Sequence, residues 1–359
     1  MIDLKKYICT VPFNNVELHD KDNFMCCPSW LLKRLPGRDK VGYGMDLWNS
    51  EDAIEIRKSV SDGSFRHCDK TQCPYLSKLI AGNTEINVPP IVLKKDLPPL
   101  LKKYAERGDG IVEDGPTIVQ FSFDRTCNYK CPSCRINLFT ANGKKINDTK
   151  SRIEEIEENY GKSLKEIYIT GSGDPFVSVS FRNFLRNFNP SKFPKLNKIH
   201  LHTNASMWTK EMWESMPNIH SYVKTCEISI DAGSEFTYEN ITRLGGNWNN
   251  LIENLQFINT LPNLFYIKTS FVVQSSNYKE MKPFLDLMKS IFGKKVHVFF
   301  GKINNWGTFN DGEFKLLKVW DETHPEHNEF ITEFNKVCLD SQVFHNMHEF
   351  VNLSKRGLI

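Results

Sequence analysis

From about residue 117 the chain alternates short apolar segments with amphipathic ones, and this alternation constrains the fold more than any other feature. The apolar segments predict strands at 117–123, 167–169, 199–202, 227–230, 266–273 and 296–300. The amphipathic segments predict helices at 147–160 (capped by Asp148 or Thr149), 181–188, 210–216, 249–260, 278–292 and 326–338. Six βα units in succession require a parallel sheet with helical crossovers. We therefore predict an α/β fold, a partial (β/α)6 TIM-like barrel whose functional loops lie at the carboxyl ends of the strands.

The rest of the chain divides around this barrel. The 359 residues have room for two domains, at about 100–200 residues per domain. Residues 1–95 show little regular periodicity and are rich in cysteine, so we expect a small domain that a metal centre stabilises more easily than a large core. We assign 96–115 to a bridge, 116–310 to the barrel and 311–359 to a carboxyl-terminal extension.

Composition excludes several classes of protein. The formal net charge of +3 is too even to indicate nucleic acid as a partner. No apolar run approaches the ~20 residues of a membrane-spanning helix. The start, residues 1–6, is too polar for a secretory signal peptide. We expect a cytoplasmic protein with no membrane association, whose thiols stay reduced.

Ten cysteines in such a compartment indicate metal binding rather than disulfides. Cys127, Cys131 and Cys134 form a compact trio directly after the first barrel strand. Three thiolates on one loop can hold three irons of a cubane cluster and leave the fourth iron open to an external ligand. Zinc is the alternative, although it favours a fourth nearby cysteine or histidine.

The CxxxCxxC spacing of this trio, at the end of a first barrel strand, resembles the signature of the radical S-adenosylmethionine (SAM) superfamily. The resemblance implies a [4Fe–4S] cluster whose open iron is chelated by SAM, and reductive cleavage of SAM to a 5′-deoxyadenosyl radical. Ser133 departs from the family pattern, in which an aromatic residue usually precedes the last cysteine.

The loops after the later strands are similar to those of the same family. Residues 170–175 resemble its Gly-Gly-Glu-Pro loop, 203–205 its Thr-Asn-Gly, 229–246 its SxDG…R-x-GG stretch and 273–277 its segment beside the adenine. Asp174 stands where the family has Glu. By resemblance, the residues expected to bind SAM are Gly171, Ser172, Gly173, Asp174, Pro175, Asn204, Ser229, Arg243 and Gln274.

A second cysteine pattern precedes the barrel. It resembles the SPASM or Twitch auxiliary-cluster domain, which normally follows the barrel. The resemblance favours the shorter Twitch form, with a single auxiliary [4Fe–4S] cluster held by four cysteines. The expected ligands are Cys9, Cys26, Cys68 and Cys73, with Cys27 competing with Cys26; tetrathiolate zinc is the alternative.

Together these features predict a radical SAM oxidoreductase or transformase. The resemblance implies an electron from a flavodoxin- or ferredoxin-type reductant and removal of a substrate hydrogen. We expect a small polar substrate, sugar- or nucleotide-like, with modification of a ribosomally made peptide as the alternative. A zinc- or iron–sulfur-binding scaffold or electron carrier is the non-enzyme alternative. No residue stands out as a catalytic acid, base or hydrogen donor.

Overall fold

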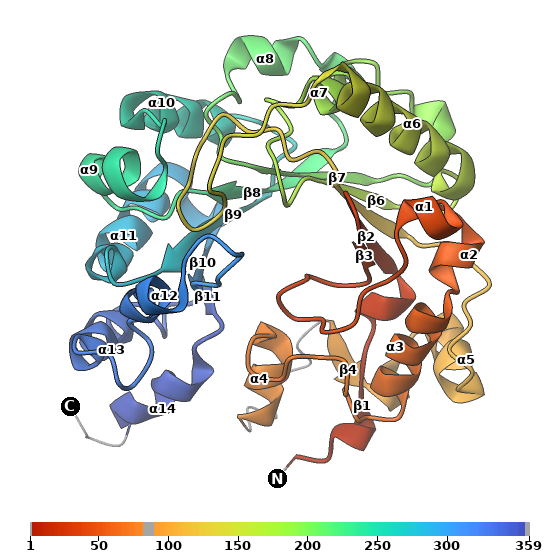
Figure 1. Ribbon diagram of the computed structural model, residues 1–359, viewed down its shortest axis with the longest axis horizontal. Coiled ribbons are helices and arrows are strands. Elements are labelled where there is room, and N and C mark those ends of the chain that lie inside the picture. Colours follow the sequence, from red (N-terminus) through yellow and green to blue (C-terminus); the bar gives the residue numbers. More distant parts are fainter. Residues whose placement is uncertain (1, 82–89, 356–359) are drawn as a thin grey trace. The chain divides into compact units, whose positions relative to one another are not determined.

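The computed structural model describes residues 2–81 and 90–355 (Figure 1). Contacts divide the chain into two compact units. The first comprises Met1–Asp124, Asn142–Ser172 and Asn189–Lys198, and the second comprises Arg125–Ala141, Gly173–Phe188 and Ile199–Ile359. Residues 1 and 82–89 of the predicted amino-terminal domain and residues 356–359 of the predicted carboxyl-terminal extension lie outside the described residues.

The first unit contains a sheet segment in the order β6-β5-β2-β3. Its strands are β2 (Asn15–His19), β3 (Asn23–Phe24), β5 (Ile118–Ser122) and β6 (Glu166–Ile169). β2 and β6 are both parallel to β5, and β3 is antiparallel to β2. We predicted β5 and β6 but not β2, so the amino-terminal segment adds a parallel strand that its composition did not indicate.

The crossover from β5 to β6 is helix α6 (Gly143–Tyr160), which begins four residues before its predicted start. Its cap is Asn142, whose side chain accepts a hydrogen bond from the amide of Lys145. The predicted caps Asp148 and Thr149 are therefore wrong. Both lie inside the helix, and Asp148 pairs with arginines instead.

The remaining elements of the first unit are short. Strands β1 (Tyr7–Cys9) and β4 (Ile91–Leu93) form an antiparallel pair. The helices are α1 (Arg38–Val41), α2 (Met45–Trp48), α3 (Glu51–Ser61), α4 (Pro74–Ile80) and α5 (Pro99–Arg107). A capped helix such as α3, which begins after the side-chain cap Ser50, shows more local order than we expected before residue 95.

A fully buried arginine links several of these elements. Arg57 of α3 donates hydrogen bonds to the carbonyls of Pro12 (2.8 Å), Trp48 (2.8 Å) and Gly110 (3.0 Å) and to Oδ1 of Asn49 (2.9 Å). Its guanidinium also lies 4.2 Å from the centre of the Trp48 ring. One side chain thus fixes three chain segments that are distant in sequence.

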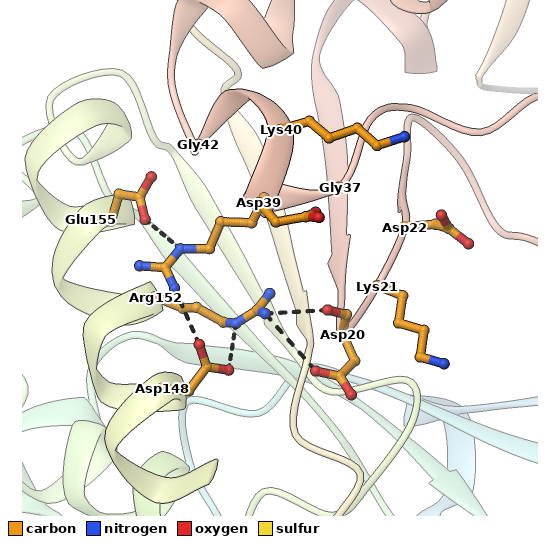
Figure 2. A pocket seen from close by; sticks show the side chains of 11 residues that line it. Asp20, Lys21, Asp22, Gly37, Asp39, Lys40, Gly42, Asp148, Arg152 and Glu155 are labelled. Atoms are coloured by element: carbon orange, nitrogen blue, oxygen red, sulfur yellow. Dashed lines mark hydrogen bonds and ion pairs between the residues drawn. The ribbon is translucent and has the colours of Figure 1, made fainter. Parts of the chain in front are cut away.

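A polar pocket in the same unit is lined by α6, α1 and the turn after β2 (Figure 2). Nε of Arg152 lies 2.9 Å from Asp148, and Nε of Arg38 lies 2.6 Å from Glu155. Figure 2 shows Asp20 on the opposite wall, and Arg152 donates to its carbonyl at 3.2 Å. Since these guanidinium groups are paired with carboxylates, we interpret this group of charged side chains as a structural link between the turn after β2 and helix α6.

The second unit contains five parallel strands in the order β11-β10-β9-β8-β7. They are β7 (Lys198–Thr203), β8 (Val223–Ser229), β9 (Tyr266–Val273), β10 (Val296–Lys302) and β11 (Val343–His345). β9 was predicted with its exact bounds, and β8 begins four residues earlier than expected. β11 was missed, because the prediction ended the sheet at residue 300.

Helices precede, separate and follow these strands, as the alternating pattern predicts. They are α7 (Val179–Arg186), α8 (Lys210–Glu214), α9 (Glu235–Thr237), α10 (Trp248–Asn259), α11 (Met281–Phe292), α12 (Asp311–Leu317), α13 (His327–Asn335) and α14 (His348–Lys355). α10 and α11 lie along one side of β8–β10 (Figure 1). The core here includes Leu201, Ile228, Phe271 and Phe300, all fully buried. No helix in the described ranges is long and apolar enough to cross a membrane.

Candidate functional site

The loop with the three predicted cysteine ligands lies in the second unit. The amides of Cys134 and Arg135 donate to the carbonyl of Cys131 (2.9 and 3.0 Å), which forms a tight turn around the last two cysteines. The amide of Lys130 donates to the carbonyl of Leu244 (3.0 Å). This bond ties the cysteine loop to the segment after the π-helical turn Tyr238–Thr242.

Each of the three sulfurs accepts a hydrogen bond from a nitrogen donor. The bonds are Asn204 Nδ2 to Cys127 Sγ (3.7 Å), Arg243 Nη1 to Cys131 Sγ (3.4 Å) and Arg135 Nη2 to Cys134 Sγ (3.5 Å). Burial raises the pKa of Cys127 to about 11 and also raises that of Cys131. Iron binds the thiolate, and nitrogen donors, two of them cationic, favour that form. The donor set therefore fits an iron–sulfur cluster held by three thiolates.

Arg243 reaches the cysteine loop from the segment after β8. Its Nη2 lies 2.6 Å from Oδ2 of Asp231, and both side chains are almost fully buried. Burial disfavours the charged guanidinium, but Asp231 and the thiol of Cys131 outweigh it and raise the pKa of Arg243. Asp231 in turn accepts the amide of Val272 on β9 (2.7 Å). The predicted SAM ligand Arg243 is thus held between the carboxylate of Asp231 and the sulfur of Cys131.

Asp174 is completely buried and has three hydrogen-bond donors. Oδ2 accepts from Thr203 Oγ1 (2.7 Å) and the amide of Asn204 (2.9 Å), and Oδ1 accepts from the amide of Phe176 (3.0 Å). Burial raises the pKa of Asp174, against the effect of these donors. The carboxyl group that we predicted to bind SAM thereby fixes the loop after β7, on which Asn204 points to Cys127.

The other predicted SAM ligands lie on neighbouring loops. Ser229 ends β8, where its hydroxyl lies 3.0 Å from Nε2 of His202, and Gln274 is buried directly after β9. Since β8 and β9 are parallel, these two residues share the carboxyl edge with Asn204.

The glycine-rich loop is divided between the two units: Gly173 and Pro175 lie in the second, and Gly171 and Ser172 in the first. Ser172 Oγ donates to the carbonyl of Ser122 at 2.5 Å. A Cβ atom on Gly171 would lie 2.6 Å from Nε2 of Gln120, so the end of this flexible side chain would have to move to make room for it.

A row of titratable residues crosses four strands of the second unit. His202, Glu227, Lys268 and His297 are register partners on β7, β8, β9 and β10. The Lys268 ammonium lies 2.9 Å from Glu227, and all four residues are half-buried. Burial opposes ionisation of Glu227, but Lys268 and His202 outweigh it and lower its pKa to about 2. Burial lowers the pKa values of both histidines. This row is a polar face with one fixed ion pair.

The five amino-terminal cysteines gather in the first unit. Burial raises the pKa of Cys9 and of Cys26, and the charges of nearby cysteines add to both shifts. The contributing groups are Cys73 and Cys68 for Cys9, and Glu17, Cys9, Cys27 and Cys73 for Cys26. Among residues 2–81 and 90–355, no three His, Cys, Asp or Glu side chains are grouped so as to hold a single metal ion.

Comparison with known families explains this geometry. Residues 121–287 match the Radical SAM superfamily. This segment is therefore similar to radical SAM domains. The match and the parallel βα order together confirm the α/β partial-barrel class that the sequence predicts. The match includes the cysteine trio and the loops of Asp174, Asn204, Ser229, Arg243 and Gln274. It implies a [4Fe–4S] cluster and SAM as cofactors.

Solved structures of radical SAM proteins resemble the chain at low identity. Streptococcus suis SuiB bound to precursor peptide SuiA has 17% identity and a TM-score of 0.46, over 68% of this chain and 52% of that chain. Native anSMEcpe with bound AdoMet has 14% identity and a TM-score of 0.43, over 67% and 61% respectively. The chain spans about half the length of the SuiB structure. No curated protein matches the chain.

Two features of the radical SAM domain were not predicted. Arg135 follows the last cysteine of the motif directly, and adjacency to the motif was its only signal. Glu227 and Lys268 were also missed, although each is a polar residue that alternates with apolar neighbours in its strand. Such alternation indicates a strand whose two faces differ in environment.

Proposed function

We propose that this protein is a radical SAM enzyme whose catalytic [4Fe–4S] cluster is held by Cys127, Cys131 and Cys134. The observation that carries the proposal is the nitrogen donor on each sulfur, two of the three from predicted SAM-binding loops. When bound, the cluster and SAM supply a 5′-deoxyadenosyl radical that removes a substrate hydrogen. The chain's own residues hold the thiolates and order the surrounding loops.

The test is anaerobic purification followed by iron and sulfide counting and measurement of 5′-deoxyadenosine after reduction with dithionite. We expect a Cys127→Ala/Cys131→Ala/Cys134→Ala triple variant to lose about four irons, the content of one cubane, and all 5′-deoxyadenosine release. Cys226→Ala is the matched control, because Cys226 is buried on β8 among apolar residues. Zinc in place of iron would contradict the proposal and favour a scaffold protein.

We further propose that Cys9, Cys68, Cys73 and Cys26 hold an auxiliary [4Fe–4S] cluster in a Twitch-like amino-terminal domain. The support is that the four cysteines lie together in the first unit and that burial raises the pKa of each thiol. Cys27 competes with Cys26 for this position, because the two cysteines are adjacent in the sequence. In the triple variant, about four irons should then remain. Loss of these irons in Cys26→Ala but not in Cys27→Ala would assign Cys26 as the ligand, and the opposite result would assign Cys27; retention of the irons in both variants would contradict the proposed ligand set.

For the substrate, we propose a small polar molecule. The support is the row of titratable residues on β7–β10, whose ion pair between Lys268 and Glu227 and whose two imidazoles can form hydrogen bonds with polar groups. A ribosomally made peptide is the second candidate, because the structurally similar SuiB is bound to a precursor peptide in its solved structure. Release of 5′-deoxyadenosine above the uncoupled rate can be measured with the dialysable fraction of a cell extract and with its peptide fraction. Stimulation by the peptide fraction alone would overturn the small-molecule assignment.

The proposed electron donor is a flavodoxin- or ferredoxin-type protein, and the proposed compartment is the cytoplasm. Both follow from the low potential that a SAM-cleaving cluster requires and from the reduced state of its thiols. Reduction of the purified protein by flavodoxin with its reductase, followed by electron paramagnetic resonance (EPR) of the cluster, tests the donor. No cluster signal with flavodoxin or ferredoxin, but a signal with dithionite, would exclude this class.

A further inference from the structure

We propose that Arg135 is a positioning residue for the catalytic cluster, and that its guanidinium raises the cluster's reduction potential by stabilising negative charge on the cysteine ligands. The inference rests on the proposed function and deepens it. The family match assigns no role to this residue, and the predicted cofactor contacts did not include it.

The first step is the geometry of the guanidinium. Arg135 has only 7% of its surface exposed, whereas Cys134, to which it donates at 3.5 Å, is the exposed cysteine of the three. Its second nitrogen, Nη1, donates to the carbonyl of Arg125 at 2.8 Å. Because one arm is anchored to the backbone, the other stays directed at the sulfur instead of turning into solvent.

The second step is the reach of the charge. The guanidinium interacts electrostatically with the sulfurs of Cys127 and Cys131 as well as Cys134, so it faces the whole ligand set. Reduction adds one electron to a cluster whose ligands are already anionic. A fixed cation a few ångströms away stabilises the reduced state more than the oxidised state, and the potential rises.

The third step is the comparison with Arg243, the other guanidinium that contacts a ligand sulfur. Arg243 lies 2.6 Å from the carboxylate of Asp231, which offsets much of its charge at the cluster. Arg243 is also a predicted SAM ligand, whereas Arg135 is not, so replacement of Arg135 leaves the predicted SAM contacts in place. Arg125 supplies a matched control, because it stands two residues before Cys127 and its side chain is exposed.

The experiment measures the midpoint potential of the SAM cluster by EPR-monitored redox titration without SAM. Wild type, Arg135→Gln, Arg135→Lys and Arg125→Gln are each compared in a background that carries Cys9→Ala and Cys68→Ala to remove the auxiliary signal. We expect a lower midpoint in Arg135→Gln, an intermediate value in Arg135→Lys and the wild-type value in Arg125→Gln. Lysine keeps the charge but does not reproduce the two-armed anchoring.

An Arg135→Gln protein with full iron and the wild-type midpoint would overturn the inference, as would an equal shift in Arg125→Gln. If Arg135→Gln retains no cluster, Arg135→Lys decides, and a wild-type midpoint there would overturn it. These outcomes differ from failure of the proposed function, in which the wild-type protein would itself hold zinc or show no reducible cluster.

Discussion

Replacement of Arg57 by methionine should destabilise the first unit more than any surface change, and the hydrogen bonds of this residue allow the size to be worked out. The guanidinium serves four acceptors. Oδ1 of Asn49 also accepts the amide of Val112 (3.0 Å), so it keeps one partner. The carbonyls of Pro12, Trp48 and Gly110 lose the donor that Arg57 supplies.

Each buried acceptor left without a donor costs about 1–3 kcal/mol, so three carbonyls give about 3–9 kcal/mol. Removal of a buried cation recovers part of this energy, because its desolvation no longer opposes folding. Methionine also keeps most of the apolar contact with the Trp48 ring. We therefore expect the variant to lose about 3–5 kcal/mol of unfolding free energy.

The assay is urea unfolding of the metal-free, reduced protein, followed by tryptophan fluorescence, which Trp48 contributes to from this site. Lys58→Met is the matched control, since Lys58 is the next residue of α3 and its side chain is exposed. Arg57→Lys keeps the charge but has three donors instead of five. A loss below about 1 kcal/mol in Arg57→Met, within the range of surface substitutions, would refute the reasoning.

Three further predictions follow from the second unit. The pKa of Glu227 falls from its ordinary 4.5 to about 2, so its ion pair stabilises the fold above pH 4.5, and this contribution disappears as the pH falls toward 2. Glu227→Gln should remove up to about 3 kcal/mol of the pH dependence of the unfolding free energy. Parallel curves of unfolding free energy against pH for wild type and variant would contradict this prediction. Gly245 has φ +96°, a backbone conformation that is strained for alanine, and a Cβ there would lie 3.4 Å from the carbonyl of Asn128 in the cysteine loop. Gly245→Ala should therefore cost about 1–2 kcal/mol of unfolding free energy and reduce the iron content. Gly293→Ala, with φ +60° and open space around its Cβ, should leave the iron content unchanged. Removal of iron with an anaerobic chelator should lower the melting temperature, because a bound cluster no longer links Cys127, Cys131 and Cys134. Addition of SAM alone should not restore the melting temperature. Equal melting temperatures by calorimetry before and after iron removal would contradict this prediction.

Much of the fold was predictable because its signals are local. The strand at Tyr266–Val273 and the helix that ends at Tyr160 follow from periodicity within one segment. β2 and β11 were not predictable in this way. Val343–His345 has only three residues, and it becomes a strand by pairing with β10. Asn15–His19 pairs with β5, about a hundred positions away along the chain.

In the candidate site, too, features within one loop were predictable and features that combine separate segments were not. The spacing of the cysteines predicts a cluster-binding loop, since ligands on one loop are constrained by sequence distance alone. The donors to the sulfurs come from separate segments, so their geometry appears only after folding. Asp174 illustrates the difference: its place in the loop was recognised, but its three donors belong to residues 176, 203 and 204.

Two strained residues show why these loops depend on each other. Ala205 (φ +63°) and Asp231 (φ +61°) both adopt the left-handed backbone, which is uncommon without glycine. At position 205 the Thr-Asn-Gly pattern has glycine, and here Asn254 of α10 holds the Ala205 carbonyl at 2.9 Å. Asp231 is held by Arg243 and by the amide of Val272. Strain of this kind persists where the surroundings over-determine the backbone. The segments that donate to Cys127 and Cys131 are therefore held by bonds from α10, from β9 and from Arg243, and their geometry belongs to the folded domain rather than to any one motif.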